Sequence, residues 1–226
     1  MKHSVSALSV VLLVALAAIL GGAPGVGAQP RASVAAEART VRPLASGWRF
    51  VQDDAMTEEA ALESTADTWE AVSLPHTWNA KDAASTDARV PYKRGRGWYR
   101  LMFDGPMPGG RHWLQFDGAS IVADVWLNGK KLGQHKGAFT AFRFDVTDVL
   151  QLRGNVLVVK ADNSAAKTEL DPTAIAPLSG DFNMSGGLYR MVNLLSTKSD
   201  VHVALDDFGG PGVYARTMTV AAPVRA

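Results

Sequence analysis

A glycine-rich loop in the last quarter of the chain carries the first residues that could do chemistry. Asp181 stands in the run SGDFNMSGG at 179–187, where glycines let the backbone approach a ligand closely. A carboxylate can accept hydrogen bonds from two adjacent sugar hydroxyls, and Asn183 could assist it. Alternatively, Asp181 closes an Asx-turn and Asn183 is a turn residue. Asp181 and Asn183 are therefore candidate substrate-binding residues.

A second candidate region begins at Asn79 and continues through the loop 81–96. Its string YKRGRGW at 92–98 mixes aromatic rings, which can stack on sugars, with arginines, which can donate to hydroxyls. We take Asn79 and Arg94 as candidate substrate-binding residues. The alternatives are a solvated turn for Arg94 and a strand core for Trp98.

The amino-acid composition excludes several other kinds of functional site. The chain has 226 residues, no Cys and five His, so thiolate zinc sites, iron–sulfur clusters and cysteine nucleophiles are excluded. Lys and Arg number 23 against 22 Asp and Glu, which gives no basic excess for nucleic acid. His76 has no partner for acid–base work that the sequence can identify, and we interpret it as a structural loop or core residue. We expect no metal, no cofactor and no nucleic-acid partner.

Short strands separated by turns must position these residues. Alternating or β-rich runs predict strands over 97–103, 111–117, 121–127, 130–135, 142–146, 155–161, 188–195 and 201–205. Asn128-Gly129 joins two of them as a hairpin turn. Residues 57–64 (TEEAALES) predict one short helix with acidic residues early. The pattern indicates an all-β fold, a two-sheet jelly-roll β-sandwich.

The two ends of the chain read differently from the middle. Residues 1–28 predict a signal peptide, because a nearly uninterrupted apolar run at 7–20 precedes small residues ending in Ala28. The run is shorter than the ~20 residues of a spanning helix, so we expect cleavage, no membrane span afterwards, and a periplasmic or secreted protein. Residues 29–43 are expected to be a flexible lead, and residues 206–226 a linker followed by one strand of a further domain.

Four local strings, in this order, make the sequence specific. They are WEAVSLPHTWN at 69–79, PYKRGRGWYR at 91–100, DVWLNGKKLGQH at 124–135 with GAFTAF at 137–142, and PLSGDFNMSGGLYR at 177–190. Together they resemble the N-terminal sugar-binding domain of glycoside hydrolase family 2, the β-galactosidase and β-glucuronidase family. The resemblance covers about residues 44–205 and continues into 206–220.

The resemblance implies a jelly-roll domain at 44–205 that precedes an immunoglobulin-like domain and a catalytic (β/α)8 barrel. In the family the two catalytic glutamates lie on the barrel, and the residue matching Asp181 contacts the non-reducing sugar. The loop after the string PHTWN borders the sugar pocket. We therefore expect a β-galactosidase-like carbohydrate-binding domain with no catalytic residue of its own, inactive unless a barrel is supplied in cis or in trans. The alternatives are an autonomous secreted carbohydrate-binding module and a non-catalytic interaction domain.

Overall fold

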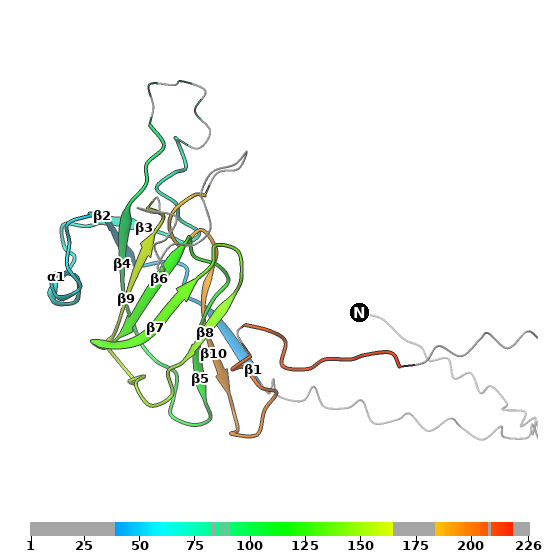
Figure 1. Cartoon of the computed structure of the whole chain (residues 1–226). Coiled ribbons are helices and arrows are strands. Elements are labelled where there is room, and N and C mark those ends of the chain that lie inside the picture. The colour runs from blue at the N-terminus through cyan, green and yellow to red at the C-terminus, as the bar shows by residue number, and fades with distance from the viewer. Residues whose placement is uncertain are drawn as a thin grey trace, which may run out of the picture. The chain divides into compact units, whose positions relative to one another are not determined.

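The computed structural model describes residues 39–82, 85, 87, 89, 91–164, 184–207 and 209–218. Within these ranges ten strands form two antiparallel sheets (Figure 1). One sheet has the order β1 (Arg39–Pro43), β10 (Val192–Thr197), β5 (His112–Phe116), β8 (Phe142–Asp145). The other has the order β3 (Glu70–Val72), β2 (Trp48–Gln52), β4 (Arg96–Phe103), β9 (Asn155–Asp162), β6 (Val122–Leu127), β7 (Lys130–Lys136). The predicted all-β, two-sheet jelly-roll sandwich is confirmed.

Alternation along the strands divides the apolar residues between an inner core and an outer cluster. On β9, Leu157 and Val159 lie in the main core together with Leu114 of the opposite sheet. Val158, between them in sequence, packs with Trp98 on the outer face. Successive strand residues point to opposite faces, so the central strands of the six-stranded sheet are apolar on both sides. The outer face therefore needs a cover of its own.

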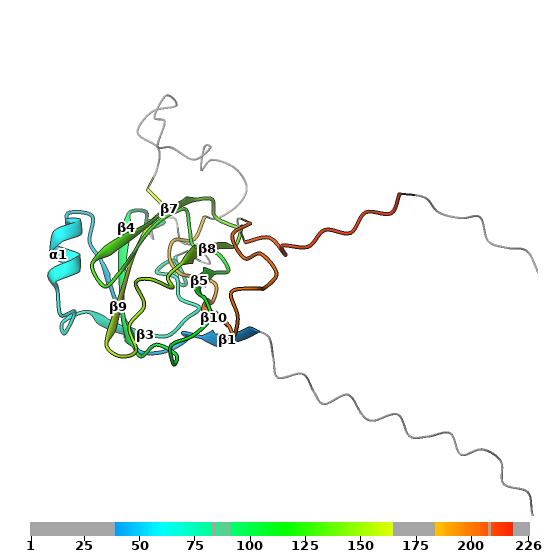
Figure 2. The same cartoon turned by 90° about the horizontal axis from the view of Figure 1, so that it is seen from below.

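The segment that carries the helix α1 (Glu58–Glu63) supplies that cover (Figure 2). Thr57 caps the helix, because its Oγ1 accepts a hydrogen bond from the Ala60 N–H at 3.2 Å. Ala61 is fully buried and packs in the outer cluster with Trp98 and Trp126. The predicted helix over 57–64 is confirmed. No helix within the described ranges has the length and apolar character needed to cross a membrane.

A buried ion cluster fastens the same segment to the sheet. Asp124 on β6 is 1% exposed, and its carboxylate lies 2.9 Å from Lys160 Nζ and 3.1 Å from Lys131 Nζ. Both ammonium groups also lie within 4 Å of Glu58 on α1, at 3.7 and 3.4 Å. Burial alone would raise the pKa of Asp124, but its bonds to the two lysines outweigh burial and lower it. The cluster therefore joins α1 to β6, β7 and β9.

The outer face of the four-stranded sheet is covered by residues 201–210. Leu205 is 1% exposed and packs between Trp113 and Leu195. Arg143 on β8 donates to the carbonyl oxygens of Leu205 at 3.2 Å and Gly210 at 2.9 Å. These contacts hold an irregular segment against the sheet through its backbone and one apolar side chain.

This arrangement differs from three predictions about the C-terminal part. Residues 201–205 are not a strand, although the sequence alternates there, because their backbone pairs with no other strand. The expected linker from residue 206 is fixed at its start, since Asp206 Oδ1 accepts a hydrogen bond from Trp113 Nε1 at 3.0 Å. The strand expected after residue 212 is also absent from residues 213–218, where the structure shows no regular element.

The N-terminal lead is shorter than predicted. Residues 29–43 were expected to be flexible, but Arg39–Pro43 form β1, which pairs with β10 from Arg39–Thr197 to Pro43–Asn193. All five side chains of β1 are exposed. The strand is therefore held by its backbone ladder rather than by burial, and no apolar alternation marks it in the sequence. The predicted signal peptide at 1–28 lies outside the described residues.

Candidate functional site

Asn79 is fully buried at the base of the two candidate loops, which in chain order are a first loop at 81–96 and a second loop at 179–187. Its Nδ2 donates to Asp82 Oδ2 at 3.0 Å and to the Lys93 carbonyl at 2.8 Å. Its Oδ1 accepts from Gly186 N at 2.7 Å and from Asn163 Nδ2 at 3.3 Å. These four partners use the full hydrogen-bonding capacity of one amide. The structure gives Asn79 a positioning role, and direct contact of its side chain with a sugar would require this network to open.

Asn163 extends the network by one hydrogen bond to each of the two loops. Its Nδ2 donates to the Met184 carbonyl at 3.0 Å, and its Oδ1 accepts from Gly95 N at 2.9 Å. Asp181 and Asn183 lie outside the described residues, between these anchored ends. Their contact with a sugar stays a prediction.

Arg94 lies between two residues of the network, Lys93 and Gly95. It is half-buried, and its guanidinium carbon is 5.5 Å from the centroid of the Tyr92 ring, within the range of a cation–π contact. Packing on Tyr92 makes Arg94 more than a solvated turn residue. A role in substrate binding stays a prediction for this side chain.

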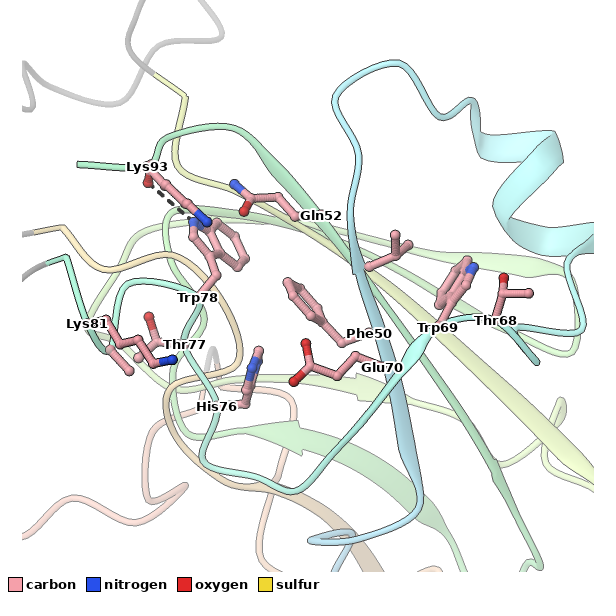
Figure 3. A pocket seen from close by; sticks show the side chains of 12 residues that line it. Phe50, Gln52, Thr68, Trp69, Glu70, His76, Thr77, Trp78, Lys81 and Lys93 are labelled. Carbon is pink, nitrogen blue, oxygen red and sulfur yellow. Dashed lines mark hydrogen bonds between the residues drawn. The ribbon is translucent and has the colours of Figure 1, made fainter. Parts of the chain in front are cut away.

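A pocket of about 620 Å³ opens beside the network, within the roughly 300–1,000 Å³ typical of ligand sites. Its aromatic lining residues are Trp78, Phe50, His76 and Trp69, as Figure 3 shows. The rings of Phe50 and Trp78 are stacked, with centroids 5.9 Å apart and planes 13° apart. The imidazole of His76 lies 4.6 Å from the Phe50 ring centroid. The pocket therefore has a continuous aromatic wall.

Two glycines allow the indole of Trp78 to pack directly against the backbone. A Cβ at Gly97 would lie 2.5 Å from the indole, and a Cβ at Gly186 would overlap it. Trp78 Nε1 donates to the Lys93 carbonyl at 3.3 Å, so the first loop also holds the ring. Only residues without a side chain allow this approach. The remaining part of the ring is half-exposed and lines the pocket.

Polar groups line the rest of the pocket. Glu70 pairs directly with Phe50 across β3 and β2, so both side chains lie on the same, inner face of the sheet. Figure 3 shows the carboxylate of Glu70 between Phe50 and His76. Within the described part of the chain, the side chains of Glu70, Gln52 and Lys81 form no hydrogen bond or ion pair. They are available to a ligand as acceptors and donors.

His76 is held in the pocket wall by Tyr99. Its Nδ1 lies 2.8 Å from the Tyr99 hydroxyl, and Tyr99 itself is fully buried. Burial lowers the pKa of His76, and the nearby charge of Glu70 opposes that change in part. Burial raises the pKa of the Tyr99 phenol, so the hydroxyl keeps its proton. These contacts support the interpretation of His76 as a structural residue.

The lining suits binding rather than bond cleavage. Among the described residues that line the pocket, Glu70 is the one carboxylate. Most glycoside hydrolases use two facing carboxyl groups. No group of three or more potential metal-ligating side chains occurs within the described ranges.

Sequence reasoning missed most of this pocket. Phe50 and Glu70 come from β2 and β3, which the predicted strands did not include. Trp78 precedes the candidate region that begins at Asn79, and Lys81 belongs to it. The local sequence does not show that either side chain lies near Phe50. One signal was available in the sequence. Gly97 lies near the start of a predicted strand and Gly186 in the glycine-rich loop, and a glycine can mark a place where a bulky side chain approaches the backbone closely.

The fold and the pocket together define a two-sheet β-sandwich with an aromatic-walled binding site. A sequence profile described as "Glycosyl hydrolases family 2, sugar binding domain" matches residues 41–198. The chain belongs to this family. The predicted resemblance is therefore confirmed over nearly the whole sandwich.

Known relatives match the chain only over a small part of their own length. A β-glucuronidase of Bacteroides fragilis is 42% identical over 146 residues, which are 63% of this chain and 20% of that protein. The β-galactosidase BoGH2A of Bacteroides ovatus is 31% identical over 182 residues, 76% of this chain and 19% of that protein. The chain spans about a fifth of the length of these curated relatives.

Solved structures give the same result. A calcium-binding mutant of Bacteroides uniformis β-glucuronidase 2 superposes with a TM-score of 0.69 and 32% identity, over 81% of this chain and 21% of that one. An FMN-binding β-glucuronidase from Facaelibacterium prausnitzii L2-6 superposes with a TM-score of 0.64 and 33% identity, over 77% and 25%. Both fold and sequence thus place this chain among the sugar-binding domains of these enzymes.

Proposed function

We propose that this chain is the carbohydrate-recognition domain of a secreted glycoside hydrolase that acts on β-galactosides or β-glucuronides. The family assignment and the printed activities of the relatives support this function. Cleavage of the O-glycosidic bond would come from a catalytic barrel, in the same polypeptide or in a partner chain. The domain alone would be inactive.

The observation that carries the proposal is the network centred on Asn79. It joins Asp82 and Lys93, which flank the first candidate loop, to Asn163 and Gly186, which flank the second. Two loops with joined bases can present their side chains to one sugar. Arg94 would contribute donors from the first loop, and Asp181 and Asn183 would contribute acceptors and donors from the second.

The test supplies a catalytic barrel from the Bacteroides fragilis relative, by fusion or in trans, and compares wild type with Asp181→Ala. Loss of a charge-assisted hydrogen bond, roughly 1.5–3 kcal/mol, should weaken sugar affinity about ten- to a hundredfold. Asp171→Ala, which removes a carboxylate ten residues earlier in the sequence, is the control. Equal affinity in both variants, with equal folding, would show that Asp181 is only a turn residue.

Export is the second part of the proposal and rests on residues 1–28 alone. A signal peptidase acting after Ala28 would leave Gln29 at the mature N-terminus. Mass spectrometry of the chain expressed in a bacterial host, fraction by fraction, tests this. A full-length chain found only in the cytoplasm would contradict export.

A further inference from the structure

Trp78 differs from the other five tryptophans in its surroundings. Those five are at most 7% exposed and belong to the core clusters. Trp78 is half-buried and lines the pocket with part of its ring. A large flat ring, open on one side, offers apolar area at low conformational cost.

We propose that the pocket walled by Trp78, Phe50 and His76 is itself a binding site for one pyranose ring. The apolar C–H face of the sugar lies against the aromatic wall. The hydroxyl groups bond to Glu70, Gln52 and Lys81. Of these residues only Lys81 belongs to a candidate loop, the one at 81–96, and Arg94, Asp181 and Asn183 take no part. The site therefore adds a contact surface to the proposed function, on which this inference rests.

The aromatic wall is preformed. The glycine contacts at positions 97 and 186 and the bond from Trp78 Nε1 to Lys93 leave the indole little freedom. Phe50 stacks against the indole, and His76 contacts Phe50 with its ring plane tilted by 57°, which fixes the neighbouring rings. A ligand that binds such a wall does not have to order it first, which lowers the entropic cost of binding.

The polar side of the pocket matches the chemistry of sugar hydroxyls. Each hydroxyl both donates and accepts a hydrogen bond, and the lining offers a carboxylate, an amide and an ammonium group. Glu70 is placed on the inner face of the sheet beside Phe50, where a carboxylate has no apolar packing role. A charge pointing inward at an edge strand can also block pairing with another sheet edge. That role would appear as a change in oligomeric state, not in sugar affinity.

The experiment follows the indole N–H signals of the ¹⁵N-labelled full chain by NMR. The probes are methyl β-D-galactopyranoside and methyl β-D-glucuronide at millimolar concentration. We expect one indole signal, absent in Trp78→Phe, to shift with saturation and a millimolar Kd. Glu70→Gln should weaken binding about tenfold because the charged acceptor is lost. Glu63→Gln, which changes an exposed carboxylate at the end of α1, is the control and should not change the affinity.

The possible outcomes distinguish sugar binding in the pocket from sugar binding at the two candidate loops. No saturable shift with either glycoside overturns the proposal, and so does binding that Trp78→Phe and Glu70→Gln both leave unchanged. Binding lost in Asp181→Ala but kept in the two pocket variants would assign the sugar to the loops and would support the proposed function alone. A Glu70→Gln variant that self-associates in gel filtration but binds sugar normally would make Glu70 an edge-protecting residue. Far-UV circular dichroism of each variant checks that the sandwich is intact.

Discussion

The outer faces of the two sheets are both covered, but by different chemistry. On the six-stranded sheet, α1 packs on an apolar cluster, and the ion cluster of Asp124 fastens it at the side. On the four-stranded sheet, residues 201–210 rely on Leu205 and on the donors of Arg143 to backbone carbonyls. The first cover is a regular element between two neighbouring strands. The second is an irregular segment that follows the last strand.

The two covers also differ in their relation to the proposed sugar pocket. Trp69 belongs to the apolar cluster under α1 and also lines the proposed sugar pocket. The first cover is therefore part of the pocket wall. The second cover borders a smaller cavity of about 320 Å³, lined by His135, Phe142 and Leu205 among others. Changes to either cover should lower the domain's stability, but only changes to the first should reach the pocket.

The largest expected effect is at Asp124, the centre of the ion cluster. Asp124→Ala removes a carboxylate that is 1% exposed and leaves Lys160 and Lys131 without their main partner. Breaking a buried pair in this way costs about 3–5 kcal/mol. Urea denaturation measures the free energy of unfolding, with the exposed Asp148→Ala as control. A loss no larger than that of Asp148→Ala would show that the cluster does not fasten α1.

A smaller loss is expected at Leu205, the anchor of the second cover. Leu205→Ala leaves a cavity between Trp113 and Leu195 and should cost roughly 2–3 kcal/mol. Val203→Ala, half-exposed in the same segment, is the matched control. Glycoside binding at the pocket should be unchanged in both. If Leu205→Ala unfolds no more easily than Val203→Ala, residues 201–210 do not stabilise the sheet.

Local signals predicted the regular parts of the fold. The hairpin of β6 and β7 turns at Asn128-Gly129, and both residues have positive φ, 52° and 79°. α1 lies within the predicted range 57–64, and Thr57, the first residue of that range, caps it. These features depend on neighbours in sequence, so composition and spacing were enough. β1 and residues 201–207 contact strands that are distant in sequence, and the local pattern predicts the wrong element for both.

The pocket and the network show the same limit. Glu70 faces Phe50 only because β3 pairs with β2, twenty residues earlier in the chain. Asn79 is a candidate from the sequence, but its partners Asn163 and Gly186 are distant in sequence, and only the structure shows that its amide joins the two loops. Spacing within one segment cannot reveal whether an amide faces a ligand or another loop.

The smallest predicted effect is on the pH dependence of stability. Burial lowers the pKa of His76, His112 and His135 from the ordinary 6.5, with nearby Glu70 and Asp145 opposing it in part for the first two. Below 6.5 the unfolded chain takes up protons that the folded chain refuses, so the free energy of unfolding should fall as pH drops.

Urea denaturation at about pH 7.5 and about pH 5.5 measures this fall. His76 lies at the edge of the six-stranded sheet, and His112 bonds Ser196 within the four-stranded sheet, with Nδ1 and Oγ 2.8 Å apart. His76→Gln and His112→Gln should each remove part of the fall, because each deletes one proton that distinguishes the two states. A larger reduction in His76→Gln would place more of the pH sensitivity on the pocket side. Stability that stays flat or rises on acidification would contradict the direction of all three pKa shifts.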